Sequence, residues 1–332
     1  MPEHGGNLAA AIRRWGIPRE QWLDLSTGIN PHPWPAPPLP TTILHRLPEE
    51  DDGLEEAARR YYGVEQVLPV PGSQAAIALL PRLRSRSRVG IVAPTYAEHE
   101  HHWRLAGHDV RCLSLDEVDS ELDELEVLVL VRPNNPDGIC LSRSRVLDWW
   151  RELRERGGWL IVDEAFVDPE PDDSLADFAR NAGFIVLRSF GKFFGLPGIR
   201  LGFVLADEDL LQKLRAGQGP WPVSSPARYW GALALADSHW QRATRARLQR
   251  SAERLKNLLD NSGLSPRGST RLFQFVPHSD AEAIQEAFAS LGILVRLWLA
   301  TDAGGPALRF GLPGAESDWR KLESALNIIM GE

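Results

Sequence analysis

Residues 184–206 read FIVLRSFGKFFGLPGIRLGFVLA and set a single lysine between two short apolar runs. The runs, Phe184–Leu187 and Phe203–Leu205, are continuous rather than alternating. This is typical of strands that are buried on both faces of a mostly parallel sheet. Lys192 stands among glycines and aromatic residues directly after the first run. Removal of its side chain from water would lower the pKa of the amine and make it nucleophilic.

Apolar runs of the same kind recur along the chain and alternate with helical patterns. Three such runs precede residue 184: Val89–Val92, Leu125–Val131 and Leu160–Val162. The helical patterns are Ser73–Leu83, Ser142–Arg156 and Asp172–Ala182. Alternation of strands and helices predicts a large, doubly wound α/β domain, which we place at residues 41–223.

The two ends of the chain are organised differently. Residues 31–40 (PHPWPAPPLP) are dense in proline, which predicts an extended, non-helical segment. We assign residues 1–40 to an N-terminal arm. A long helical stretch covers about Ser224–Asp260. Strand and helix patterns then alternate in the tail: Leu272–Val276, Asp280–Leu291, Ile293–Leu297, Leu308–Leu312 and Glu316–Ile329. Residues 224–332 therefore predict a long helix followed by a smaller α+β domain.

Composition and charge exclude several classes of protein. The net charge of -8 does not fit nucleic-acid binding, which needs clustered Lys and Arg. The only two cysteines, Cys112 and Cys140, suit a reducing cytosol. No apolar run approaches the ~20 residues of a membrane span, and residues 1–6 lack the features of a signal peptide. We expect a cytoplasmic protein with no nucleic-acid or membrane partner.

The lysine loop is the most specific motif. Ser189 lies three residues before Lys192, and Arg200 lies eight residues after it. With this spacing the segment resembles the lysine loop of the fold type I enzymes that use pyridoxal 5'-phosphate (PLP), which have the aspartate-aminotransferase fold. The resemblance implies that Lys192 binds PLP as a Schiff base, and that Ser189 and Arg200 bind the cofactor phosphate. Taken alone, the segment would equally fit a surface lysine in a glycine-rich loop.

Two further motifs precede the lysine loop in the order that the resemblance requires. Pro71-Gly72-Ser73-Gln74 opens a helix, whose free N–H groups suit a phosphate. The resemblance therefore assigns Ser73 and Gln74 to cofactor binding, although Ser73 would also serve as an ordinary helix cap. Pro94-Thr95-Tyr96 follows a buried strand, where the family places an aromatic ring against the pyridine ring.

The motifs at residues 132–138 and 163–166 complete the set. Arg132–Gly138 (RPNNPDG) resembles the family's Asn-Pro turn, which assigns Asn135 to the phenolic oxygen of the cofactor. Asp163 ends an apolar strand, the place where α/β folds bind ligands. Its carboxylate would pair with the protonated pyridine nitrogen and keep the ring an effective electron sink. Alone, each motif would be a turn or a cap, but five in register make the PLP assignment strong.

Two marks favour one branch of these enzymes. His4-Gly5-Gly6-Asn7 and Asp24–Pro31 (DLSTGINP) resemble the opening of the threonine-phosphate decarboxylases of cobalamin (vitamin B12) biosynthesis. Phe166 stands where the histidinol-phosphate aminotransferases typically carry Tyr. The resemblance implies decarboxylation of L-threonine O-3-phosphate to (R)-1-amino-2-propanol O-2-phosphate. A histidinol-phosphate-type aminotransferase is the alternative, and a non-enzymatic regulator with the PLP fold is a third, less favoured one.

A substrate with two anionic ends needs cationic or polar partners. The resemblance maps Arg309 onto the arginine that holds a substrate's anionic end, and an arginine inside an apolar strand needs such a bidentate partner. Arg296, His4 and Asn30 are further candidates, for the substrate phosphate. The alternatives are a buried ion pair for Arg309, a solvated Arg296, a terminal histidine and a turn asparagine.

Leu47 departs from the pattern of the relatives. They commonly carry Tyr at this position, which reaches the cofactor phosphate of the neighbouring subunit. Leucine cannot make that hydrogen bond, so we assign Leu47 no cofactor role. The resemblance nevertheless implies a homodimer.

The histidine-rich segment Glu98–His102 (EHEHH) raises the question of a metal site. His99 and His102 have the i, i+3 spacing that metal sites on helices use. No cysteine-rich motif accompanies them, so we interpret the segment as the polar face of a half-exposed helix and expect no metal.

Overall fold

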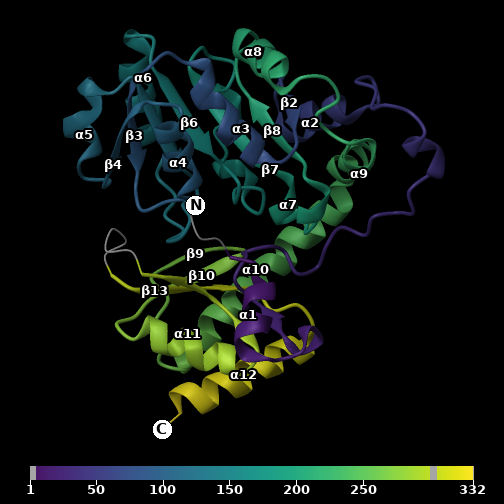
Figure 1. Cartoon of the computed structure of the whole chain (residues 1–332), viewed down its shortest axis with the longest axis vertical. Coiled ribbons are helices and arrows are strands. Elements are labelled where there is room, and N and C mark those ends of the chain that lie inside the picture. The colour runs from purple at the N-terminus through teal and green to yellow at the C-terminus, as the bar shows by residue number, and fades with distance from the viewer. Residues whose placement is uncertain (1–4, 300–304, 332) are drawn as a thin grey trace. The chain divides into compact units, whose positions relative to one another are not determined.

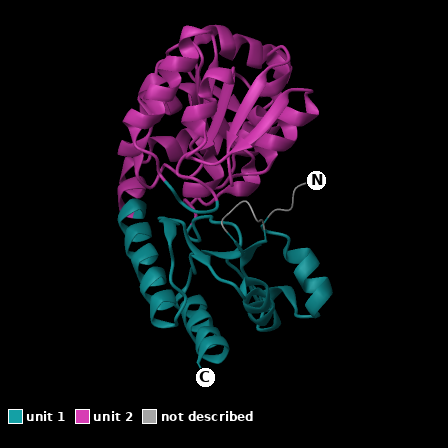
Figure 2. Ribbon diagram, turned by 90° about the vertical axis from the view of Figure 1, so that its left-hand side faces the viewer, with its two compact units in different colours: residues 1–32, 136–139, 244–332 teal, residues 33–135, 140–243 magenta. Residues whose placement is uncertain are grey.

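The computed structural model describes residues 5–299 and 305–331, which divide into two compact units (Figure 2). The large unit comprises residues 33–135 and 140–243. The small unit comprises the described residues within 1–32, 136–139 and 244–332. Each unit has its own β-sheets. No helix in the described part of the chain has the length and apolarity needed to cross a bilayer.

A seven-stranded sheet forms the centre of the large unit (Figure 1). The strands lie in the spatial order β2 (Leu68–Val70), β8 (Gly202–Leu205), β7 (Phe184–Ser189), β6 (Trp159–Asp163), β5 (Val127–Val131), β3 (Arg88–Val92) and β4 (Asp109–Leu113). Only β8 runs antiparallel to its neighbours; the other pairs in this sheet are parallel. The amino end of β8 therefore lies at the same edge as the carboxyl ends of the other six strands. This architecture confirms the predicted mostly parallel α/β fold.

The central strands of this sheet are buried because they are apolar along most of their length, whereas the edge strand β4 (DVRCL) exposes three of its five residues. All five residues of β5 (VLVLV) are buried, as are the first five of β7. Helices pack around the sheet: α2 (Leu54–Tyr62), α3 (Ser73–Leu79), α4 (Glu98–Leu105), α5 (Val118–Glu121), α6 (Arg143–Glu155), α7 (Phe190–Phe193), α8 (Glu208–Gln218) and α9 (Ser225–Ala236). Because helices cover both faces, polar side chains that bind a ligand are expected at the ends of the strands.

One predicted helix of the large unit is wrong. In place of a helix over Asp172–Ala182, the chain forms two short 3-10 turns, Pro171–Asp173 and Ala176–Phe178. A buried side chain explains the difference, since Glu164 accepts hydrogen bonds from the Ser174 hydroxyl (2.6 Å) and the Leu175 backbone N–H (2.7 Å). These bonds hold the backbone in an irregular course that a continuous helix would not allow.

The long helical stretch predicted over Ser224–Asp260 is two helices, α9 and α10 (Ser238–Asn261). They are separated at Asp237, whose carboxylate accepts hydrogen bonds from the Trp240 backbone N–H and the Trp34 indole, both at 3.0 Å. The carboxylate thus takes the place of the helical backbone acceptors at the start of α10. Sequence periodicity alone does not show this break.

The small unit contains two sheets. A four-stranded antiparallel sheet has the order β12 (Arg296–Trp298), β13 (Ala307–Gly311), β10 (Phe273–Pro277) and β9 (Gly268–Thr270). A second, two-stranded sheet pairs β1 (Leu23–Asp24) in parallel with β11 (Ile293–Leu294). The helices are α1 (Leu8–Trp15), α11 (Ala281–Ser290), α12 (Glu316–Met330) and the part of α10 from residue 244. The predicted run Ile293–Leu297 is therefore two strands in different sheets.

Candidate active site

The residues predicted to bind the cofactor lie at one edge of the large sheet. Asp163 and Ser189 end β6 and β7, Arg200 lies just before β8, and the others follow the carboxyl ends of β2, β3, β5 or β7. Because these strand ends share an edge, the fold brings together the following side chains: Ser73, Gln74, Tyr96, Asn135, Asp163, Ser189, Lys192 and Arg200.

Three polar groups converge where β2, β8 and β7 adjoin. Val70 and Ser189 both pair with Gly202, one from each side. A Cβ at Gly202 would lie 2.5 Å from the Ser73 backbone nitrogen, and a Cβ at Gly72 would lie 2.6 Å from Nη2 of Arg200. These close approaches require glycine. They place the Arg200 guanidinium next to the first turn of α3, on the strand edge where Ser189 also lies.

Arg200 has a backbone conformation that residues other than glycine rarely adopt, with φ 56° and ψ 61°. Such conformations occur preferentially at ligand sites. The guanidinium donates one hydrogen bond to the Pro197 carbonyl (3.1 Å) and the residue is exposed. A guanidinium, a serine hydroxyl and backbone N–H groups form the donor set that a phosphate requires, so these residues fit the phosphate of PLP.

Asp163 is held by partners on both of its carboxylate oxygens. Oδ2 lies 3.0 Å from Nε2 of His99, and Oδ1 accepts a hydrogen bond from the Ala165 backbone N–H (3.0 Å). The side chains of Asp163 and His99 are 4% and 2% exposed. A carboxylate fixed in this way at a strand end can stabilise a proton on a heterocyclic nitrogen. The pair therefore fits the pyridine nitrogen of PLP.

His99 is the site residue whose role the sequence analysis missed. The helix face that carries it was expected to be half-exposed, but His99 and Glu98 are both buried, at 1% and 8%. The expectation fails because α4 packs this face onto the sheet. Within the described ranges, no three His, Cys, Asp or Glu side chains are grouped so that they could hold a metal ion.

Lys192 lies in α7, directly after β7, and is half-buried. Its Nζ is 5.3 Å from the centre of the Phe166 ring, within the range of a cation–π contact. The buried rings of Phe190 and Phe194 are stacked with centroids 4.3 Å apart, and the half-buried ring of Trp240 stacks on Phe194. The helix that carries Lys192 thus packs on an aromatic cluster.

A buried ion cluster fixes the two strand ends that carry Asp163 and Ser189. Arg188 Nη1 lies 2.9 Å from Glu164 Oε2, and Nη2 donates to Asp168. The three side chains are at most 3% exposed. Burial raises the pKa of Glu164, and the charge of Arg188 opposes this shift. Loss of one partner from such a buried pair typically costs about 3–5 kcal/mol.

The Asn-Pro turn contacts the loop that carries Tyr96. Asn134 donates from Nδ2 to the Pro94 carbonyl (2.9 Å) and accepts from the Thr95 hydroxyl (2.8 Å). Asn135 was predicted from the Asn-Pro motif, whereas Asn134 is a second site residue, besides His99, whose role was not predicted. Asn135 is half-buried in the same turn. The hydrogen bonds of Asn134 therefore hold the turn that carries Asn135 against the loop of Tyr96.

Within the small unit, Arg309 and Arg296 occupy paired positions on β13 and β12. Arg309 is buried (5% exposed), and its Nη2 donates to the Ser26 carbonyl at 2.7 Å. Burial and the nearby charge of Arg296 lower the pKa of Arg309 to about 9. Like charges at directly paired positions are unfavourable, so this pair favours an anion.

The other predicted substrate residues lie in the N-terminal segment of the small unit. Asn30 is buried, and its Oδ1 accepts a hydrogen bond from the His32 backbone N–H (3.0 Å). A cavity of about 900 Å³ is lined by α1, α11 and the β11–β12 segment and includes Arg296 and Ser26. His4 lies outside the described residues.

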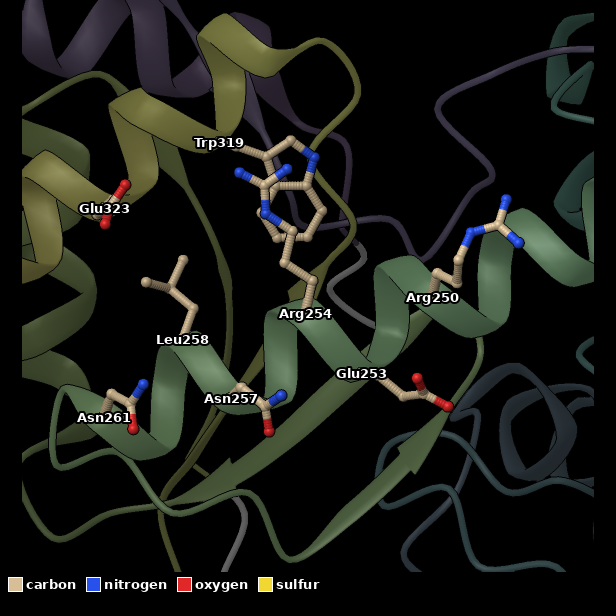
Figure 3. Close-up of a pocket in the computed structure, with 8 residues that line it drawn as sticks. All are labelled: Arg250, Glu253, Arg254, Asn257, Leu258, Asn261, Trp319 and Glu323. Carbon is tan, nitrogen blue, oxygen red and sulfur yellow. The ribbon is translucent and has the colours of Figure 1, made fainter.

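A second hollow, of about 460 Å³, lies between α10 and α12 (Figure 3). The guanidinium of Arg254 lies 4.3 Å from the centre of the Trp319 ring and makes two 2.7 Å hydrogen bonds to Glu316. The residues that line this hollow include none of those predicted for the active site. We therefore assign it no part in the chemistry.

The family model described as aminotransferase class I and II matches residues 43–318. The chain belongs to this family. Among its relatives is a threonine-phosphate decarboxylase of Pseudomonas aeruginosa, which is 49% identical over 326 residues; these cover 98% of this chain and 97% of the relative. The resemblance that the five motifs indicated is thus confirmed.

Solved structures of the family have the same fold. A histidinol-phosphate aminotransferase from Sinorhizobium meliloti, in complex with pyridoxal-5'-phosphate, has a TM-score of 0.83 at 21% identity and covers 97% of this chain and 94% of its own. An L-threonine-O-3-phosphate decarboxylase from Porphyromonas gingivalis has a TM-score of 0.72 at 22% identity, with coverages of 88% and 92%. Family members with different names thus share the fold, so the fold does not select the reaction.

Proposed function

We propose that the chain is a PLP-dependent threonine-phosphate decarboxylase that converts L-threonine O-3-phosphate to (R)-1-amino-2-propanol O-2-phosphate for cobalamin biosynthesis. The observation that carries this proposal is the 49% identity, over nearly the whole chain, to a protein with that name. We further infer that it works in the cytoplasm as a homodimer.

The residues at the edge of the large sheet bind and tune the cofactor. Arg200, Ser189 and the first turn of α3 at Ser73 bind its phosphate, and Lys192 attaches it covalently. Asn135 donates to its phenolic oxygen. When bound, PLP supplies an electron sink for the electron pair that carbon dioxide leaves at Cα. Asp163 holds a proton on the pyridine nitrogen, and the 3.0 Å contact between His99 and Asp163 supports a role for His99 in keeping that carboxylate in place.

The small unit supplies the cations that hold the substrate. Arg309 binds the carboxylate, because a buried guanidinium gives a bidentate and directional contact. Arg296, Asn30 and His4 bind the substrate phosphate. Two cations at paired strand positions support a substrate with two anionic ends, and L-threonine O-3-phosphate has a carboxylate and a phosphate. Holding both ends orients the Cα–carboxylate bond, so that this bond rather than the Cα–H bond breaks.

Lys192 completes the reaction as a proton donor. Once the carboxylate has left as carbon dioxide, Cα must receive a proton to give the amine product. The same residue attaches the cofactor, so its amine is placed beside the carbon that must receive the proton. An ammonium beside the Phe166 ring is stabilised by the cation–π contact and can return the proton to Cα.

The deciding experiment supplies purified protein with each substrate in turn. Carbon dioxide release from threonine phosphate, without transfer of the amino group to 2-oxoglutarate, is the expected result. Efficient amino transfer from histidinol phosphate, with no carbon dioxide from threonine phosphate, would identify an aminotransferase instead.

A further inference from the structure

We propose that Gln74, Glu98 and His102 form a hydrogen-bonded relay that positions the ring of Tyr96 and thereby sets the tilt of the cofactor ring beneath it. The relay joins α3, which carries Gln74, to two successive turns of α4. The proposal rests on the proposed function, because it requires bound PLP and takes Tyr96 in the role that the family resemblance implies, with its ring against the pyridine ring. The three partners are positioning residues, since each acts through the hydroxyl of Tyr96.

The hydrogen bonds of the relay connect the Tyr96 hydroxyl, through Gln74, to two side chains of α4. The hydroxyl donates to Oε1 of Gln74 at 3.1 Å. The amide nitrogen of Gln74 donates to Oε2 of Glu98 at 2.7 Å. Nε2 of His102 lies 3.2 Å from that same oxygen and 3.3 Å from the amide nitrogen. The amide group of Gln74 is thus engaged at both of its ends.

The carboxylate of Glu98 fixes the direction of every hydrogen bond in the relay. A carboxylate only accepts hydrogen bonds, so Gln74 must turn its NH₂ group toward Glu98 and its carbonyl toward Tyr96. That carbonyl also only accepts, so Tyr96 must be the donor. The phenol therefore has to keep its proton. Consistently, burial and the charges of Glu98 and Asp163 raise the pKa of Tyr96 to about 12, against the opposing charge of Arg200.

Burial makes the relay effective as a restraint. The side chains of Glu98 and His102 are 11% and 17% exposed, so water competes weakly for their hydrogen bonds. A tyrosine ring held only by packing can swing about its Cα–Cβ bond, but a hydrogen bond at the far end of the ring restrains that swing and so fixes the direction of the ring's long axis. The same helix also holds Asp163 through His99. One helix therefore positions partners for both the face and the nitrogen of the cofactor ring.

The central test is a double-mutant cycle between Tyr96→Phe and Glu98→Gln in the holoenzyme. Tyr96→Phe keeps the ring and removes the donor, whereas Glu98→Gln removes the group that fixes the direction of the relay. Each single variant should weaken PLP binding about fivefold, the worth of roughly one hydrogen bond, and reduce the visible circular dichroism of the bound cofactor. The double variant should be no worse than either single one, because both break the same chain of contacts. Additive losses, or an unchanged dichroism, would overturn the proposal.

Two further variants make the cycle interpretable. Glu100→Gln makes the same chemical change on the same helix, at a carboxylate that pairs with Arg104 and is 40% exposed; it should behave as wild type. If Glu98→Gln does not fold, Gln74→Leu removes both ends of the amide at similar size and should match Tyr96→Phe. A Gln74→Leu variant with wild-type dichroism would equally overturn the proposal.

A cofactor-free measurement separates failure of the relay from failure of the proposed function. Ultraviolet titration of the apo protein, with Tyr96→Phe subtracted, reports the ionisation of Tyr96. Gln74→Leu changes no charge but removes the carbonyl that accepts from the phenol, so Tyr96 should ionise at lower pH in Gln74→Leu but not in Glu100→Gln. If this holds while the wild type does not bind PLP, the relay stands and the PLP assignment fails. If PLP binds and neither the titration nor the dichroism changes, the relay fails alone.

Discussion

Asp163 illustrates how much of the chemistry depends on a single buried charge. Asp163→Asn should still bind PLP, because the phosphate and lysine contacts are elsewhere on the sheet edge. Its kcat should fall by about a hundredfold or more, since an amide cannot hold the proton on the pyridine nitrogen. Steady-state carbon dioxide release, together with cofactor content from absorbance, measures both effects. Near-normal turnover in Asp163→Asn would show that the carboxylate has no such role.

Arg309 provides the test of substrate orientation. In Arg309→Lys a point charge replaces the guanidinium fork, and loss of such a contact typically costs ~2–5 kcal/mol. Because ~1.4 kcal/mol corresponds to one decade, kcat/KM should fall by one to several decades. A looser substrate should also undergo more abortive amino transfer, which release of pyridoxamine phosphate would reveal. A variant that keeps the wild-type ratio of the two reactions would refute the assignment.

At the scale of elements, α4 makes the large unit sensitive to acid. Burial lowers the pKa of His102 and the charges of His101 and Arg82 act in the same direction, whereas Glu98 opposes them. In the small unit, burial and Arg247 likewise lower the pKa of His32.

A histidine whose pKa is lower in the folded state favours folding fully above its unfolded value of about 6.5. As pH falls below that value, the unfolded chain takes up the proton first, and the free energy of unfolding decreases. The Tm of the apo protein should therefore drop between about pH 7 and the lowered pKa, and less so in His102→Gln. An equal slope in wild type and His102→Gln would contradict this account of α4.

Elements were predictable from the sequence where hydrophobicity alone determines them. The predicted run Leu125–Val131, for example, contains the observed strand Val127–Val131 and begins two residues before it. The failures occur where a side chain replaces backbone bonding: Glu164 organises the turns at 171–178, and Asp237 separates α9 from α10. The pairing of His99 with Asp163 was hidden for a related reason. It joins residues 64 positions apart, and no local pattern reports such a contact.

At the scale of the whole molecule, the expected homodimer can be tested at two leucines that follow the proline-rich segment. Leu44 and Leu47 are both 60% exposed, which is unfavourable for large apolar side chains in a monomer. Sedimentation should give a dimer at working concentrations, and Leu44→Asp with Leu47→Asp should shift it toward monomer. Ile328→Asp, on α12 and 68% exposed, is the matched control and should leave the dimer intact. An active wild-type monomer would show that the active site does not need a residue from a second subunit.

The parallel pairing of β1 with β11 has a consequence for how the chain is made. Leu23 pairs with Ile293, so the first strand leaves the ribosome long before its partner exists. At ~5–20 residues per second, the wait is roughly fifteen seconds to a minute. During this interval the whole of the large unit is synthesised, while residues 5–32 have no sheet to join. Nascent chains stalled before residue 293 should therefore be cut by protease in that leading segment first.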